Sequence, residues 1–138
     1  MSNYFSIAEL TASFTASRFG IDNTPPKEVA DKLQVLISEC LNPIREAYGK
    51  PIIVTSGYRC EALNKKVGGK PTSQHLRGEA VDIVGANNEE TRKIFEVAKR
   101  LGRYDQLLYE RNSVGKIWVH LSYKREGNRG QCIDDYKA

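Results

Sequence analysis

The sequence predicts an α+β domain, in which a small, mostly antiparallel sheet has helices packed on one face. Three observations favour this class. A long early stretch has apolar residues at helical spacing, four short apolar or alternating runs follow it, and a glycine-containing turn separates the last two runs. At 138 residues we expect one domain, with a helical part over 1–50, a core over 51–124 and a tail over 125–138.

Two helices are predicted before the first strand. Ser6 followed by Glu9 is a capping-box pattern, so a short helix should begin near Ile7. A long helix should then run over about 26–48, because two prolines precede an apolar stripe at helical spacing. Pro43 lies inside it and predicts a local kink or boundary. The stripe consists of Val29, Leu33, Leu36, Ile37, Cys40 and Ile44.

Two further helical segments are expected later in the chain. One or two helical turns fit residues 61–67. Asn87 with Glu90 three residues later resembles an N-terminal cap, and the helix that follows should end near Gly102.

Four segments are predicted as strands. Residues 52–55 form a short apolar run and should be a buried strand, and 80–84 should form a second one. Residues 107–110 and 117–123 should pair as a hairpin across the turn at 111–116. The polar chain after this hairpin is expected to be loosely ordered.

Composition excludes several classes of protein. Three widely spaced cysteines without a Cys-x-x-Cys pair argue against a disulfide framework and a thiolate zinc site, and are expected to stay reduced. The start, MSNYFSIAEL, lacks a signal-peptide pattern, and no apolar run approaches the roughly 20 residues of a membrane span. We therefore expect a protein that is cytoplasmic when made. Its net charge of +4 favours an anionic partner, but the scattered basic residues argue against a nucleic-acid binder.

The two histidines, His75 and His120, form with Asp82 the most informative constellation. Two imidazoles and one carboxylate leave a tetrahedral zinc ion one open position, which is typical of a catalytic zinc site. Gly78 lies between His75 and Asp82 and would permit a turn that brings their side chains to one ion.

Three more residues are candidates for contacts around this metal. Strand alternation places Trp118 on the same face as His120, where the indole would line a substrate cleft or pack against the sheet. Ser73 and Gln74 precede His75 and are candidates to bind substrate or to hydrogen-bond the metal-bound imidazole.

The pattern Ser-x-His-x-x-Gly-x-Ala-x-Asp resembles the signature of the zinc D-Ala-D-Ala carboxypeptidase family. That family is related to the vancomycin-resistance dipeptidases, several phage endolysins and the Hedgehog zinc domain. Residues 55–60, 105–110 and 118–123 are similar to further segments of the family, in the expected order, so the resemblance covers about 52–123. The signature residues are Ser73, His75, Gly78, Ala80 and Asp82.

The resemblance implies a role for several of these residues. Zn²⁺ would be bound by the two histidines and Asp82, and Arg59 would stabilise charge developing on the substrate carbonyl oxygen. Many members have an acidic base three residues before the last zinc histidine, where this chain has Ile117. Glu110 resembles a Glu that occupies this place in the Hedgehog-like arrangement, and is a better candidate than Glu79, which strand alternation does not direct to the metal.

The resemblance also implies the reaction. We expect a zinc metallopeptidase that cuts peptidoglycan stem peptides, either as a D-Ala-D-Ala carboxypeptidase or as an endolysin-type endopeptidase acting on the wall after release. The alternative is a non-catalytic, zinc-stabilised module that binds cell wall or protein, which the exchange at Ile117 keeps open. A monomer is the simplest expectation for the oligomeric state.

Overall fold

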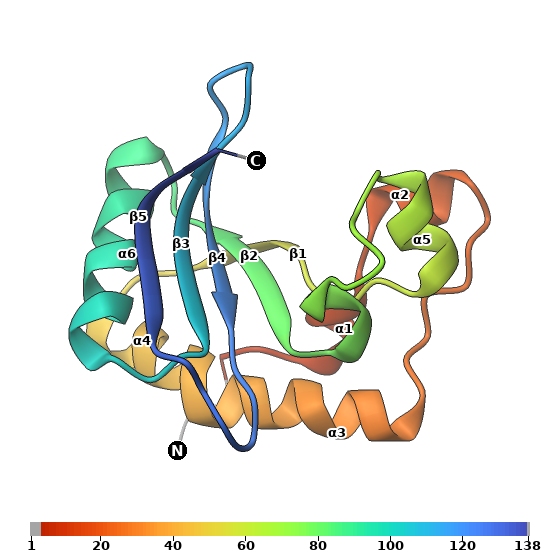
Figure 1. Ribbon diagram of the computed structural model, residues 1–138, viewed down its shortest axis with the longest axis horizontal. Helices are drawn as coiled ribbons and strands as arrows, with labels where there is room; N and C mark the ends of the chain where they lie inside the picture. Colours follow the sequence, from red (N-terminus) through yellow and green to blue (C-terminus); the bar gives the residue numbers. More distant parts are fainter. Residues whose placement is uncertain (1–3, 138) are drawn as a thin grey trace.

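A computed structural model describes residues 4–137 and contains a five-stranded sheet with helices around it, which confirms the α+β prediction (Figure 1). The strand order is β1-β2-β4-β3-β5. All neighbouring pairs are antiparallel except β3 and β5, which run parallel. The strands are β1 (Ile53–Ser56), β2 (Ala80–Val84), β3 (Gln106–Arg111), β4 (Ile117–Ser122) and β5 (Gln131–Lys137).

The register of the central strands decides which side chains share a face. Asp82 of β2 lies opposite His120 of β4, and Glu110 of β3 lies opposite Trp118 of β4. Because opposite residues and residues two apart share a face, these four side chains lie on the same side of the sheet. The alternate residues of the same strands form the other side, and those in the middle of the sheet are fully buried, namely Val81, Ile83, Leu107, Val119 and Leu121.

Helix α6 (Asn88–Leu101) covers that other face. Its Ile94 and Phe95 are fully buried in one core cluster with the inward residues of the strands. The predicted cap is confirmed, since Asn87 Oδ1 accepts a hydrogen bond from the Glu90 amide at 2.9 Å. The helix ends at Gly102, whose left-handed φ of 69° suits glycine. Burial of one helix face against the sheet leaves the opposite sheet face available for chemistry.

The predicted long helix exists but is interrupted. It consists of α3 (Lys27–Leu36), a π-helical segment η1 (Ile37–Leu41) and α4 (Asn42–Tyr48). Pro43 lacks an amide hydrogen, and its ring would collide with the Glu39 carbonyl in a regular α-helix. A wider turn relieves that conflict, and the Asn42 amide bonds the Ile37 carbonyl, five residues back.

Three short helices lie beyond the β1 end of the sheet (Figure 1). They are α1 (Ile7–Thr11), α2 (Phe14–Arg18) and α5 (Glu61–Lys66). The helix start predicted at Ser6 is confirmed, because the Ser6 hydroxyl accepts a hydrogen bond from the Glu9 amide at 3.1 Å. Helix α2 was not predicted, although Ser13 caps it in the same way through the Ala16 amide. Within residues 4–137, no helix has the length and apolarity to cross a membrane.

Two sequence predictions were wrong. The run at 52–55 is not a buried strand, because β1 is an edge strand and Ile53 is 52% exposed. The tail is not loosely ordered, because Gln131–Lys137 forms β5 alongside β3. Cys132 of this strand packs against the main core. The sheet therefore extends beyond the predicted core boundary at residue 124.

Candidate metal centre

The structure brings His75, Asp82 and His120 together on the sheet face opposite α6. One ligand atom from each lies within 4.8 Å of the others. Asp82 Oδ2 is 3.4 Å from His75 Nε2, and Asp82 Oδ1 is 3.0 Å from His120 Nδ1. Ligands bonded to a tetrahedral zinc at its usual distances stand about 3.3 Å apart. The three residues thus fit a zinc ion in both donor chemistry and spacing.

His75 is oriented for metal binding by the backbone. Its Nδ1 lies 2.7 Å from the Gly57 carbonyl oxygen, and the ring is almost fully buried. A carbonyl only accepts, so Nδ1 donates its proton to it and Nε2 is the ring nitrogen that faces Asp82. Such a bond from the second ring nitrogen is the usual support of a zinc-bound histidine. The sequence did not predict this role for Gly57. The available signal was that Gly57 lies within residues 55–60, which are similar to a segment of the carboxypeptidase family.

The turn that carries His75 is built by its neighbours. Ser73 caps η2 (Gln74–Arg77) and accepts from the His75 amide at 3.1 Å. Gly78 ends the segment with φ 72°, and a side chain there would lie 2.8 Å from Val29 Cγ1. Glycine is therefore required for both backbone conformation and space. Ser73 thus bonds the backbone of His75, whereas the bond to the imidazole that was predicted for Ser73 or Gln74 is made by the Gly57 carbonyl.

Two histidines keep Asp82 ionised. Burial alone raises the pKa of Asp82, but the imidazoles of His75 and His120 more than offset it, and the net pKa lies well below its usual range. A carboxylate held in its charged form is the state that binds a divalent cation.

Glu110 and Arg59 border the centre with opposite charges. Burial raises the pKa of Glu110, the nearby His120 lowers it and the Asp82 carboxylate raises it, with a net rise above the ordinary value. Burial lowers the pKa of Arg59, while Asp82 and Glu110 act to raise it. The Arg59 guanidinium donates to Ser73 Oγ at 3.3 Å, and its Nε has no hydrogen-bond partner in the described part of the chain. A buried donor without a partner is unusual, because most buried polar groups are hydrogen-bonded.

Trp118 lies half-buried beside Glu110, its partner on the neighbouring strand. Its indole Nε1 is buried and, among residues 4–137, makes no hydrogen bond of ordinary geometry. The indole nevertheless lies close enough to Glu110 to lower the pKa of that carboxyl, against the larger effect of burial. A second donor with spare capacity therefore lies on the face that carries the metal centre.

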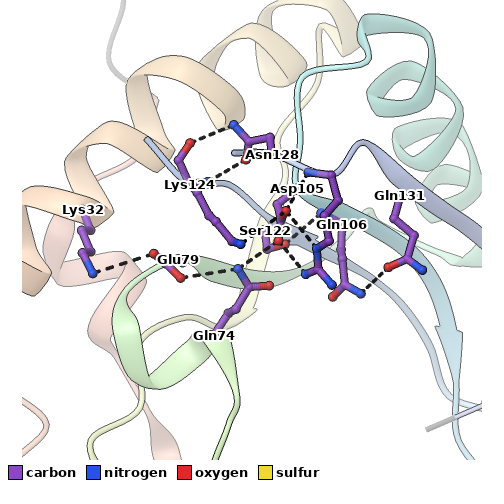
Figure 2. Close-up of polar contacts among 10 residues, drawn as sticks. Lys32, Gln74, Glu79, Asp105, Gln106, Ser122, Lys124, Asn128 and Gln131 are labelled. Atoms are coloured by element: carbon purple, nitrogen blue, oxygen red, sulfur yellow. Dashed lines mark hydrogen bonds and ion pairs between the residues drawn. The ribbon is translucent and has the colours of Figure 1, made fainter. Parts of the chain in front are cut away.

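Gln74 points away from the metal centre. Its side-chain amide donates to Glu79 Oε1 at 3.4 Å and to Asp105 Oδ2 at 3.1 Å, as Figure 2 shows. Glu79 is also 3.8 Å from Lys32 Nζ, on the α3 side. The structure thus places neither Gln74 nor Glu79 at the metal; both belong to a network around Asp105 to which the sequence assigned no role.

A cleft of about 460 Å³ adjoins the centre. It lies between α2, β1 and α5, and Gly57 and Arg59 are among the residues that line it. Its walls combine apolar side chains with hydroxyl groups, including Phe14, Val54, Leu63, Ser13, Thr15 and Thr55. A lining that combines apolar and hydrogen-bonding groups is typical of ligand-binding clefts.

A comparison with protein-family models finds a match to the family described as Peptidase M15, over residues 3–122. The matched region includes the metal centre, Arg59, Glu110 and strands β1 to β4, and it ends before β5. A comparison with curated proteins finds no match.

Proposed function

The chain belongs to the Peptidase M15 family, and from this membership we propose that it is a zinc metallopeptidase that hydrolyses peptide bonds in the stem peptides of bacterial peptidoglycan. The observation that carries the proposal is the grouping of His75, Asp82 and His120, with ligand atoms within 4.8 Å, next to Arg59 and Glu110. Such a substrate places the action at the cell wall, where the net charge of +4 favours approach to an anionic surface.

His75, Asp82 and His120 would hold the zinc ion. When bound, zinc supplies a Lewis acid that lowers the pKa of a water to about 7 and polarises the scissile carbonyl. The Gly57 carbonyl keeps the His75 ring in the required tautomer throughout.

Glu110 is the group proposed to move the proton. Its raised pKa brings it closer to neutrality than an exposed carboxylate, which suits a residue that must both accept and return a proton. The Glu110 carboxylate would take a proton from the attacking water and deliver it to the leaving amine.

Arg59 is proposed to stabilise charge on the carbonyl oxygen. Its guanidinium is partly desolvated and is positioned by Ser73, and its Nε is an unused buried donor. Donors fixed in advance toward developing charge typically contribute about 3–4 kcal/mol to the transition state.

The deciding experiment is mass spectrometry of purified peptidoglycan fragments after incubation with the zinc-loaded protein. We expect new stem-peptide products, whose masses will show whether the enzyme is a carboxypeptidase or an endopeptidase. Glu110→Gln should reduce their rate of formation by roughly 10²–10⁴-fold with zinc still bound. Glu126→Gln, an exposed acid on the β4–β5 connection, is the matched control and should retain activity.

The second candidate is a zinc-stabilised binding module. Ile117, half-buried and paired with Arg111, stands where many relatives of the D-Ala-D-Ala carboxypeptidases have an acidic residue. A protein that binds zinc and peptidoglycan fragments but forms no product from several wall chemistries would support this module and overturn the peptidase.

A further inference from the structure

Asp105 is a fully buried carboxylate immediately before β3. Three donors of Arg129 bond it: the backbone amide at 2.9 Å, Nε at 3.1 Å and an NH2 group at 2.6 Å. A buried charge is tolerated only when partners replace its lost hydration. Asp105 therefore depends on Arg129, 24 residues further along the chain.

Gln74 connects this ion pair to the metal centre. Its side chain donates to Asp105, and its backbone carbonyl accepts the amides of Gly78 and Glu79, which closes the turn (Figure 2). His75 is the next residue in that turn. A shift of Gln74 would therefore move the ring that must face Asp82.

The same network also reaches β4, the strand of His120. The Asp105 amide donates to the Ser122 carbonyl at 2.7 Å, and Ser122 Oγ accepts from the Gln106 amide at 2.9 Å. The Tyr123 amide donates to the Glu79 carbonyl at 2.9 Å. Both histidine-bearing elements are thus tied to the start of β3.

Arg129 comes from a part of the chain outside the matched family region, which ends at residue 122. After β4 the chain turns back, with Asn128 bonded twice to Lys124, crosses the start of β3 and enters β5. The Gln131 amide donates to the Asp105 carbonyl at 3.0 Å as β5 begins. The crossing segment therefore places Arg129 directly at Asp105.

We propose that Arg129 and Asp105 are positioning residues for the metal centre, acting on His75 through Gln74. The segment after β4 therefore has two roles: it adds β5 to the sheet, and it supplies Arg129, which holds the metal centre in position. The expected effect on hydrolysis rests on the proposed function. The expected effects on the position of His75 and on zinc affinity do not.

The test uses the chain's two histidines as separate probes. Their imidazole signals are recorded by two-dimensional ¹H–¹⁵N NMR in the metal-free full-length protein, and zinc affinity is measured by chelator competition. The variants are Arg129→Met, Gln74→Met and the double variant, with Arg129→Lys as the conservative exchange. Asp134→Asn is the matched control, because it removes the ion pair of β5 with Arg92 on α6 but makes no contact with Asp105.

We expect Arg129→Met and Gln74→Met each to shift the His75 signal and weaken zinc binding about tenfold or more, within the range found for residues that support metal ligands. The double variant should be little worse than either single one, because both interrupt one pathway. Arg129→Lys should recover part of the loss, and Asp134→Asn should resemble the wild type. With a hydrolysed substrate, kcat should fall more than KM changes.

The inference is overturned if Arg129→Met and Asp134→Asn leave His75 and zinc affinity equally unaffected while lowering thermal stability alike. That result would give Arg129 a purely structural role. Failure of the proposed function is a different result. If the wild type hydrolyses no substrate but the His75 signal still shifts in Arg129→Met, the peptidase proposal is wrong and the positioning role of Arg129 stands.

Discussion

Asp82 is the residue on which the metal centre depends most. Its two oxygens face two different imidazoles, at 3.4 Å from His75 and 3.0 Å from His120, so one carboxylate holds both rings in place before any ion is bound. It is also the acidic member of the cluster and offsets part of the charge of a divalent cation. Its replacement should affect ion binding more than that of any surface acid.

Zinc should stabilise the wild-type protein strongly and the Asp82→Asn variant weakly. At 100 times its dissociation constant, a ligand specific for the folded state adds about 2.7 kcal/mol to the free energy of unfolding. Thermal unfolding with zinc, and again after EDTA, measures this increment. Asp31→Asn, an exposed acid on α3, should keep the full increment. An equal increment in Asp82→Asn would show that zinc binds elsewhere.

At the scale of elements, the η2 turn is fixed by what surrounds it. Gly78 has φ 72°, and a Cβ there would lie 2.8 Å from the Val29 side chain and 2.9 Å from the Val29 carbonyl oxygen. Helix α3 therefore packs directly against the turn that carries His75 and leaves no space for a side chain at Gly78. Gly115 in the β3–β4 turn allows backbone strain to be separated from steric conflict. Its φ of 84° is similar to that of Gly78, but no atom lies within 4 Å of the position that a Cβ would take.

Gly78→Ala should destabilise the protein more than Gly115→Ala. Both exchanges place alanine in the left-handed region, which costs about 1–2 kcal/mol. Only Gly78→Ala adds a collision, for which we expect roughly 1–3 kcal/mol more and a weakened zinc affinity. Denaturant unfolding of the two variants measures the difference. If both variants lose the same free energy of unfolding, α3 can move to accommodate the methyl group and does not fix the conformation of the turn.

At the scale of the whole molecule, the ion pair of Asp105 with Arg129 connects the last strand to the centre of the sheet. Hydrogen bonds from Arg129 lower the pKa of Asp105 to about 2, against the effect of burial. A carboxyl group whose pKa is lower in the folded protein stabilises the fold above its unfolded pKa, near 3.9, and loses that contribution as the pH falls toward 2. The ion pair should therefore add to the free energy of unfolding at neutral pH, and this contribution should be lost in acid.

The stability difference between the wild type and Asp105→Asn should narrow by roughly 2 kcal/mol between pH 5 and pH 2. Urea unfolding at a series of pH values measures it. The difference between the wild type and Asp31→Asn should stay nearly constant, because an exposed helical ion pair is worth less than about 1 kcal/mol. A pH-independent difference for Asp105→Asn would contradict the assigned role of the carboxylate.

Local patterns in the sequence were sufficient for much of this fold. Caps at Ser6 and Asn87 involve residues three apart, so they were predicted correctly. The grouping of His75, Asp82 and His120 was accessible because the chain has only two histidines and because their residue types suit zinc. Strand alternation also placed Trp118 on the face of His120.

Long-range pairings could not be read in the same way. The burial of a strand depends on which strand lies beside it, so the apolar run at 52–55 gave no sign that β1 is an edge. Strand β5 pairs in parallel with β3, and its polar sequence shows little apolar alternation. Asp105 and Arg129 meet only because the chain crosses β3 there, which no local pattern records.

The π-helical segment at Ile37–Leu41 has a consequence for insertions and deletions. A π turn amounts to one additional residue in an α-helix, and one residue corresponds to a rotation of about 100° around the helix axis. Pro43 would still exclude a regular α-helix after removal of a single residue, such as the exposed Glu39, so the wider turn would persist and α3 would rotate by about 100° relative to α4. Val29 would then turn away from Gly78, and Lys32 from Glu79. The length of this helix, counted in single residues, therefore sets the angular alignment between the scaffold and the turn that carries His75.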